Sequence, residues 1–184
     1  MIWDTTKFNE VIRNIELSKK MGFDVKINVV AMRGVNDHEI FDFIEFSKNM
    51  DIEVRFLEIM RIGFALDEQN NQFIAANELI NKLKEKFDLT PIIKEKDSTS
   101  FNYRLNNGAQ IGFIASESQP FCTNCSRWRL SADGILRACL LKDAGVSIKD
   151  TNSLEREEIF AKLLGMKPAM RPEQVEHQMN EIGG

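Results

Sequence analysis

The segment from Cys122 to Cys139 reads CTNCSRWRLSADGILRAC and carries the most informative pattern in the chain. Its 3 cysteines are all the cysteines of the sequence, and they follow the spacing C-x2-C-x13-C. A C-x2-C turn places two thiolates on one side of a loop. Asp133-Gly134 is a favourable turn dipeptide for a hairpin that brings the third cysteine back. The segment therefore predicts a hairpin that gathers three thiols around one centre.

The number of cysteines leaves the nature of that centre open. An odd count is a poor disulfide framework, and clustered thiols are typical of metal or redox chemistry. Structural zinc takes four protein ligands, so zinc would need His38 or His177, which are both remote in sequence. A 4Fe–4S cluster on three cysteines instead leaves one iron open to an external molecule. Spacing alone favours zinc and a cluster equally, whereas an electron carrier would use four cysteines.

Two arginines follow the second cysteine. Arg127 and Arg129 flank Trp128, and alternate residues of a strand point to the same face. Guanidinium groups match phosphate oxygens in bidentate geometry. The pair is therefore either a phosphate clamp beside the metal centre or a solvated strand face, which is the commoner meaning of an isolated Arg-x-Arg.

Towards the N-terminus, helices and strands alternate. Apolar periodicity predicts helices over about 8–21, 40–50 and 77–87, with Asp37 as the N-cap of the second, and strands over 24–32 and 53–60. This order is typical of part of a parallel α/β barrel. Two strands cannot close a barrel, because the eight-strand form takes about 250 residues. We therefore expect the chain to begin in the middle of a fold.

After Thr90 the pattern changes to short strand candidates at 91–96, 101–105 and 110–115, with a hairpin signal at Asn107-Gly108. The cysteine segment and a helix over about 154–164 follow. We expect an α/β protein with a boundary at about residue 89. Residues 1–89 would form part of a barrel, and residues 90–184 a small α+β region that carries the metal site.

The amino-acid composition limits the classes of binding partner to be expected. The net charge of −4 provides no global field that would collect nucleic acid. No apolar run approaches the roughly 20 residues of a membrane span, and the N-terminus lacks a signal-peptide core. We expect a cytoplasmic protein that binds neither nucleic acid nor membranes.

The cysteine segment closely resembles the C-terminal cluster motif of the GTP 3′,8-cyclase family, also called molybdenum cofactor biosynthesis protein A. Besides the cysteines, the matching residues are Arg127, Arg129, Leu130, Ser131, Asp133, Gly134, Leu136 and Arg137. Three other stretches agree in family order: 25–30 with 34–37, 55–60 and 179–184. The resemblance covers essentially the whole chain and makes zinc the minor alternative.

The resemblance implies a radical-SAM-type barrel and two iron–sulfur clusters. In the family, a first cluster on an N-terminal Cys-x3-Cys-x2-Cys loop cleaves S-adenosylmethionine to a 5′-deoxyadenosyl radical. The second cluster binds GTP through its open iron. The product is (8S)-3′,8-cyclo-7,8-dihydroguanosine 5′-triphosphate, an early compound of molybdenum cofactor biosynthesis.

Carried over by position, the resemblance makes Cys122, Cys125 and Cys139 the ligands of the second 4Fe–4S cluster. The GTP contacts it implies are Lys26, Arg55, Arg127, the Trp128 backbone, Arg129, Gly183 and Gly184. Met60 resembles a position that contacts S-adenosylmethionine. Arg55 and Met60 have opposite strand parity, so both reach the site only if the chain bends between them.

The departure from the family is large, because no Cys-x3-Cys-x2-Cys loop occurs in the sequence. We therefore expect no catalytic residue in this chain and no cleavage of S-adenosylmethionine by it alone. Such a chain is either a shortened form or half of a split enzyme whose companion chain supplies the N-terminal half. A homodimer is left open. The alternative function is a non-catalytic nucleotide-binding module with zinc or a cluster.

Overall fold

The computed structural model describes residues 7–63, 65–93, 98–172 and 178–182. Its larger sheet has the strand order β1 (Lys26–Ala31), β2 (Glu53–Glu58), β5 (Gln110–Ile114), β4 (Phe101–Leu105) and β3 (Leu89–Ile92). The strands β1, β2 and β5 are parallel, and β3 and β4 are antiparallel to their neighbours. A small antiparallel sheet contains β6 (Arg129–Leu130), β7 (Ile135–Arg137) and β8 (Gly145–Ser147).

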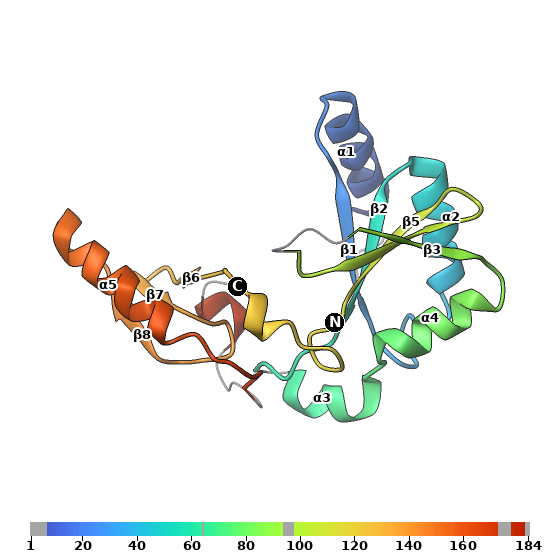
Figure 1. Cartoon of the computed structure of the whole chain (residues 1–184). Coiled ribbons are helices and arrows are strands. Elements are labelled where there is room, and N and C mark those ends of the chain that lie inside the picture. Colours follow the sequence, from blue (N-terminus) through green and yellow to red (C-terminus); the bar gives the residue numbers. More distant parts are fainter. Residues whose placement is uncertain (1–6, 64, 94–97, 173–177, 183–184) are drawn as a thin grey trace.

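The helices are α1 (Phe8–Lys20), α2 (Ile40–Met50), α3 (Ala65–Gln72), α4 (Ala76–Lys84) and α5 (Ser153–Gly165), with short 3₁₀ turns η2 (Cys122–Asn124) and η3 (Met179–Glu181). Figure 1 shows α5 and the small sheet to one side of the larger sheet, with the η2 segment between them. None of the helices in the described part of the chain is long and apolar enough to cross a membrane.

One face of the larger sheet is apolar and lies under α2 and α4. Val54 and Phe56 of β2 are buried there, together with Phe113 of β5 and with Ile44 and Leu83 of the two helices. Burying each such side chain contributes about 1.5–3 kcal/mol, so this layer is the main core of the protein.

The opposite face of the same sheet is polar where it meets the C-terminal region. The register aligns Asn28 of β1, Arg55 of β2, Gly112 of β5 and Asn102 of β4 in one row across four strands. Because side chains alternate along a strand, this row points away from α2 and α4. We call this side of the sheet the polar face.

The structure confirms a mixed α/β fold and most of the predicted elements, with four differences, of which the unpredicted short strand β8 is one. The helix α3 was not predicted, since its sequence ALDEQNNQ has little apolar periodicity. Asp37 is not an N-cap: Glu39 precedes α2, and the Asp37 carboxylate accepts a 2.9 Å hydrogen bond from the Gly34 N–H. The predicted strand over 91–96 ends at residue 92, and its residues 94–96 lie outside the described residues.

The strand order also bears on the predicted division of the chain. The strands β1 and β2 precede residue 89, β3 begins at Leu89, and β5 pairs directly with β2. The larger sheet therefore includes strands from both sides of the predicted boundary. Within the described residues β1 and β3 are edge strands, so this sheet is open and not a closed barrel.

Candidate functional site

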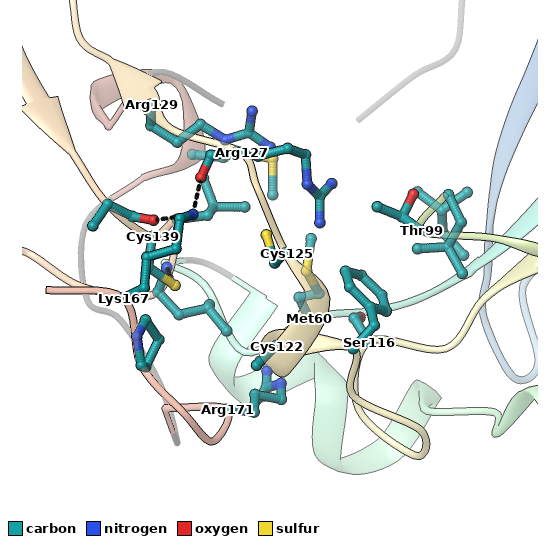
Figure 2. A pocket seen from close by; sticks show the side chains of 18 of the residues that line it. Met60, Thr99, Ser116, Cys122, Cys125, Arg127, Arg129, Cys139, Lys167 and Arg171 are labelled. Atoms are coloured by element: carbon teal, nitrogen blue, oxygen red, sulfur yellow. Dashed lines mark hydrogen bonds between the residues drawn. The ribbon is translucent and has the colours of Figure 1, made fainter. Parts of the chain in front are cut away.

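The three thiols are brought together by one turn and one hairpin. The Cys125 N–H donates a 3.2 Å hydrogen bond to the Cys122 carbonyl, which closes the η2 turn. The strands β6 and β7 then pair with Arg129 opposite Arg137, and Gly134 turns between them with a φ of 81°. Cys122, Cys125 and Cys139 line one cavity of about 330 Å³ (Figure 2). The predicted hairpin is confirmed.

The hairpin turn is held by side chains of the same segment. Ser131 is buried, and its hydroxyl donates to the Asp133 carboxylate and accepts a 2.8 Å hydrogen bond from Arg137 Nη1. The hydrogen bond from Ser131 lowers the pKa of Asp133. These residues fix the shape of the turn between β6 and β7.

Two of the thiols differ in their electrostatic surroundings. Burial raises the pKa of Cys122, and its proximity to Cys139 and Cys125 adds to that effect. Burial also acts to raise the pKa of Cys125, but hydrogen bonding with the backbone and side chain of Arg127 outweighs it, so the net pKa is lowered. Cys125 is therefore the more readily ionised of these two thiols.

The two arginines face the cavity, and the tryptophan between them faces away. Arg127 and Arg129 line the cavity, whereas Trp128 packs against Phe160 of α5 with ring centroids 5.2 Å apart. Burial lowers the pKa of Arg129, and the charge of Arg127 lowers it further. The buried Arg129 Nε has no hydrogen-bond partner among the described residues. Two like charges and an unused donor favour binding of an anion.

The polar face supplies the other wall of the cavity. Asn28, Arg55 and Met60 line it, and Figure 2 shows Thr99 across from Arg127. The strand β2 ends at Glu58, and the Met60 carbonyl accepts a 2.9 Å hydrogen bond from the Ile62 N–H in a turn. This change of direction brings Arg55 and Met60 to the same cavity despite their opposite parity.

Other predicted positions are not brought to this cavity. Lys26 is not among its lining residues, and its ammonium pairs with the Asp24 carboxylate at 2.9 Å. Gly183 and Gly184 lie outside the described residues.

Two cationic residues that line the cavity were not predicted from the sequence. Lys167 and Arg171 follow α5 and line the cavity, and Arg171 forms a largely buried ion pair with Glu117. No motif in the sequence marks them. The only available signal is their position shortly after the end of a predicted helix.

The residues around the cavity offer three thiols as metal donors. Among the described residues, no three His, Cys, Asp or Glu side chains are grouped closely enough to hold one metal ion. His38 is exposed in the turn before α2, and His177 lies outside the described residues. Zinc draws its thiolates in to about 2.3 Å, whereas an iron–sulfur cluster lets each cysteine bind a different iron. Three thiols around one cavity fit the second arrangement.

Comparison with known proteins shows the family of this chain. The profile described as Molybdenum Cofactor Synthesis C matches residues 52–177, which include the cysteine hairpin and most of the cavity. The chain belongs to this family. The resemblance drawn from the cysteine segment is thereby confirmed.

Individual curated proteins that resemble this chain support the same family. A GTP 3′,8-cyclase of a Synechocystis species is 54% identical over 176 residues, which cover 96% of this chain and 54% of the relative. A GTP 3′,8-cyclase of Aquifex aeolicus is 36% identical over 156 residues, which cover 85% of this chain and 48% of the relative. The chain thus spans about half the length of the curated relatives it matches.

Proposed function

We propose that this chain is the part of a GTP 3′,8-cyclase that holds a 4Fe–4S cluster and GTP. The observation that carries the proposal is that Cys122, Cys125 and Cys139 share one cavity with Arg127 and Arg129. The relatives' name supplies the substrate, and the cavity supplies thiols for iron and cations for phosphates.

In this proposal each wall of the cavity has its own task. The three cysteines hold the cluster, whose uncoordinated iron supplies a Lewis-acidic position for the nucleotide. Arg127 and Arg129 bind phosphate oxygens, and the Trp128 side chain anchors their backbone on α5. Arg55 approaches the nucleotide from the polar face. Lys26, Gly183 and Gly184 remain proposed GTP contacts on the resemblance alone.

The rest of the reaction needs parts that the relatives contain over their greater length. Met60 lines the cavity from the end of β2, and we assign it to S-adenosylmethionine. In the complete enzyme the nucleotide is converted to (8S)-3′,8-cyclo-7,8-dihydroguanosine 5′-triphosphate for molybdenum cofactor biosynthesis. The contribution of this chain is to bind and orient GTP, and the radical comes from elsewhere.

Two surfaces suit contact with those further parts. The strand β1 is an edge strand, and α1 beside it has no buried residue. Phe8, Val11 and Leu17 of α1 are more than half exposed. We propose that the remaining half of the barrel, on the same polypeptide or a companion chain, covers α1 and pairs with β1.

Anaerobic reconstitution tests the metal assignment. Incubation with iron and sulfide should give about one 4Fe–4S cluster per chain, measured by absorbance and by iron and sulfide analysis. Cys139→Ser should lower iron retention greatly, whereas Ser126→Ala, at an exposed neighbouring position, should not. Stoichiometric zinc that iron cannot replace would support the zinc-containing nucleotide-binding module instead.

A further inference from the structure

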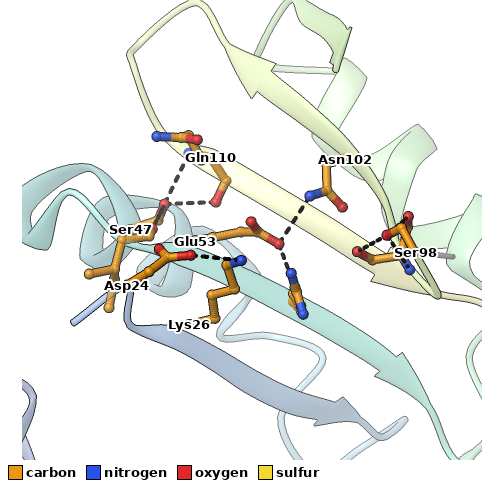
Figure 3. A network of polar contacts seen from close by, with 10 residues as sticks. Asp24, Lys26, Ser47, Glu53, Ser98, Asn102 and Gln110 are labelled. Atoms are coloured by element: carbon orange, nitrogen blue, oxygen red, sulfur yellow. Dashed lines mark hydrogen bonds and ion pairs between the residues drawn. The ribbon is translucent and has the colours of Figure 1, made fainter. Parts of the chain in front are cut away.

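Arg55 is held by the Glu53 carboxylate, which also accepts a hydrogen bond from the Asn102 amide on the polar face. Its Nε lies 2.5 Å from Glu53 Oε1, and both side chains are largely buried. Asn102 Nδ2, from β4, donates a 3.0 Å hydrogen bond to the same carboxylate oxygen. Figure 3 shows this network on the polar face of the sheet. A carboxylate on one strand thus joins an arginine two residues later to an amide two strands away.

Gly112 provides the space that the network occupies. It lies between Arg55 and Asn102 in the row across the sheet. A Cβ at Gly112 would lie 2.7 Å from Asn102 Oδ1, 3.1 Å from Arg55 Cγ and 3.2 Å from Glu53 Oε1. These distances are shorter than normal contacts, so any side chain at this position would push the network apart.

The network leaves the outer part of the guanidinium available. Only the Nε edge of Arg55 is bonded among the described residues, and Arg55 lines the cavity that holds the cysteines and Arg127. Asn102 Oδ1 is buried and also has no hydrogen-bond partner within the described part of the chain. The terminal Nη groups can therefore bind an oxygen of a ligand while the Nε is kept in place.

We propose that Glu53 and Asn102 are positioning residues, which aim the Arg55 guanidinium into the cavity, and that Gly112 makes this arrangement sterically allowed. The inference rests on the proposed GTP site. A free arginine side chain loses conformational freedom about several rotatable bonds when it binds a ligand. The network already restricts these bonds before GTP binds, so less entropy is lost on binding. Without Glu53 the Arg55 guanidinium would keep its charge, but no side chain among the residues that the structure describes would hold its orientation.

If only the charge of Glu53 mattered, the expected effect of its removal on GTP affinity would be the opposite, so one variant distinguishes the two explanations. Glu53 is an anion near the site, so its removal should strengthen binding of an anionic nucleotide if charge is all that matters. If position matters, Glu53→Ala should weaken GTP binding about fivefold or more. Glu53→Gln keeps an acceptor oxygen without the charge. Its GTP affinity should therefore be at least about half that of the wild type.

The experiment measures GTP affinity of the cluster-loaded 184-residue chain by calorimetry, with iron content and thermal midpoint recorded for every variant. Gly112→Ala should weaken GTP binding without changing any charge. Gly165→Ala is the matched control, because a Cβ there meets nothing within 4 Å. In an Arg55→Met background, Glu53→Ala should have no further effect on GTP affinity.

The outcomes separate this inference from the proposed function. Weaker binding in Glu53→Ala and Gly112→Ala, lost in the Arg55→Met background, supports the inference. Normal or tighter GTP binding by iron-replete Glu53→Ala overturns it, and so does an equal loss in the Arg55→Met background. If the wild-type chain does not bind GTP, the proposed function fails and takes this inference with it.

Discussion

The ammonium of Lys167 donates a 2.6 Å hydrogen bond to the backbone carbonyl of Arg127, 40 residues earlier in the chain. It also donates to the Ala138 carbonyl at 3.0 Å. These carbonyls lie on the two sides of the cysteine hairpin, one in Arg127 itself and the other in the residue before Cys139. One side chain from beyond α5 therefore joins the two sides of the hairpin, close to Cys139 and to the arginine pair.

Lys167→Met should loosen this hairpin while keeping the length of the side chain. Two hydrogen bonds from a charged donor are lost, and their partial exposure limits the cost in unfolding free energy to about 1–3 kcal/mol. Chemical denaturation measures this cost, and amide exchange should quicken across residues 126–139. Lys162→Met, on α5, is the control. A Lys167→Met protein as stable and as protected as wild type would show that the contact is incidental.

Glu58 should be among the most sensitive positions for stability. Its buried carboxylate accepts 2.8 Å hydrogen bonds from the N–H groups of Ala76, Glu117 and Ser118. Glu58→Ala would leave these donors unsatisfied and should cost about 3 kcal/mol or more in unfolding free energy. Glu58→Gln, which keeps one acceptor oxygen, should cost less. Urea denaturation tests the order, and equal losses would contradict the assignment.

The elements with strong periodicity could be predicted from the sequence. The strand Phe101–Leu105 was predicted with the bounds that the structure has, because alternating side chains and an Asn-Gly turn define it locally. The pairing of β5 with β2 could not be predicted. It joins residues more than fifty positions apart, and nothing in either strand specifies its neighbour.

In the candidate site too, residues within one sequence motif could be predicted, whereas residues brought in from distant segments could not. Cys122, Cys125, Cys139 and the Arg127/Arg129 pair were found because they share one short motif. Lys167 and Arg171 reach the cavity only through the packing of the segment after α5, so no local pattern indicates them. Lys26 was assigned to the GTP site from the family resemblance, and in the structure its ammonium forms an ion pair with Asp24.

The two thiols with shifted pKa values should react at different rates in the metal-free chain. The pKa of Cys125 is lowered and that of Cys122 is raised, so Cys125 holds the larger thiolate fraction below pH 9. Iodoacetamide should therefore modify Cys125 before Cys122, and peptide mass spectrometry measures this order. As pH rises through the pKa of Cys122, the difference should shrink.

The Arg127 side chain is one cause of the low pKa of Cys125. Arg127→Ala should raise that pKa and slow alkylation of Cys125 at neutral pH. Arg13→Ala, an exposed arginine on α1, is the matched control. Faster modification of Cys122 than of Cys125 in the wild-type chain would contradict the assignment.

The exposed side of α1 should bind the N-terminal half that we propose completes the barrel. A polypeptide that contains the N-terminal half of the Synechocystis relative should copurify with this chain. Leu17→Glu should weaken that complex about tenfold or more, because it places a charge in an apolar interface. Leu154→Glu changes a leucine on α5 that is more exposed than Leu17, and it should have no effect. Equal affinity of the two variants would remove α1 from the interface.

We propose that the cysteines and the arginine pair form one site for GTP. The direct measurement is the electron paramagnetic resonance spectrum of the reduced cluster, titrated with GTP. GTP should change the spectrum of the wild-type chain, and Arg127→Ala with Arg129→Ala should raise the Kd at least about tenfold. Each charge-assisted contact to phosphate is worth about 1.5–3 kcal/mol. Arg13→Ala with Arg104→Ala, which removes two exposed arginines, should leave the titration unchanged. Equal GTP affinity in the cluster-loaded Arg127/Arg129 variant, or a spectrum that GTP does not alter, would contradict the claim.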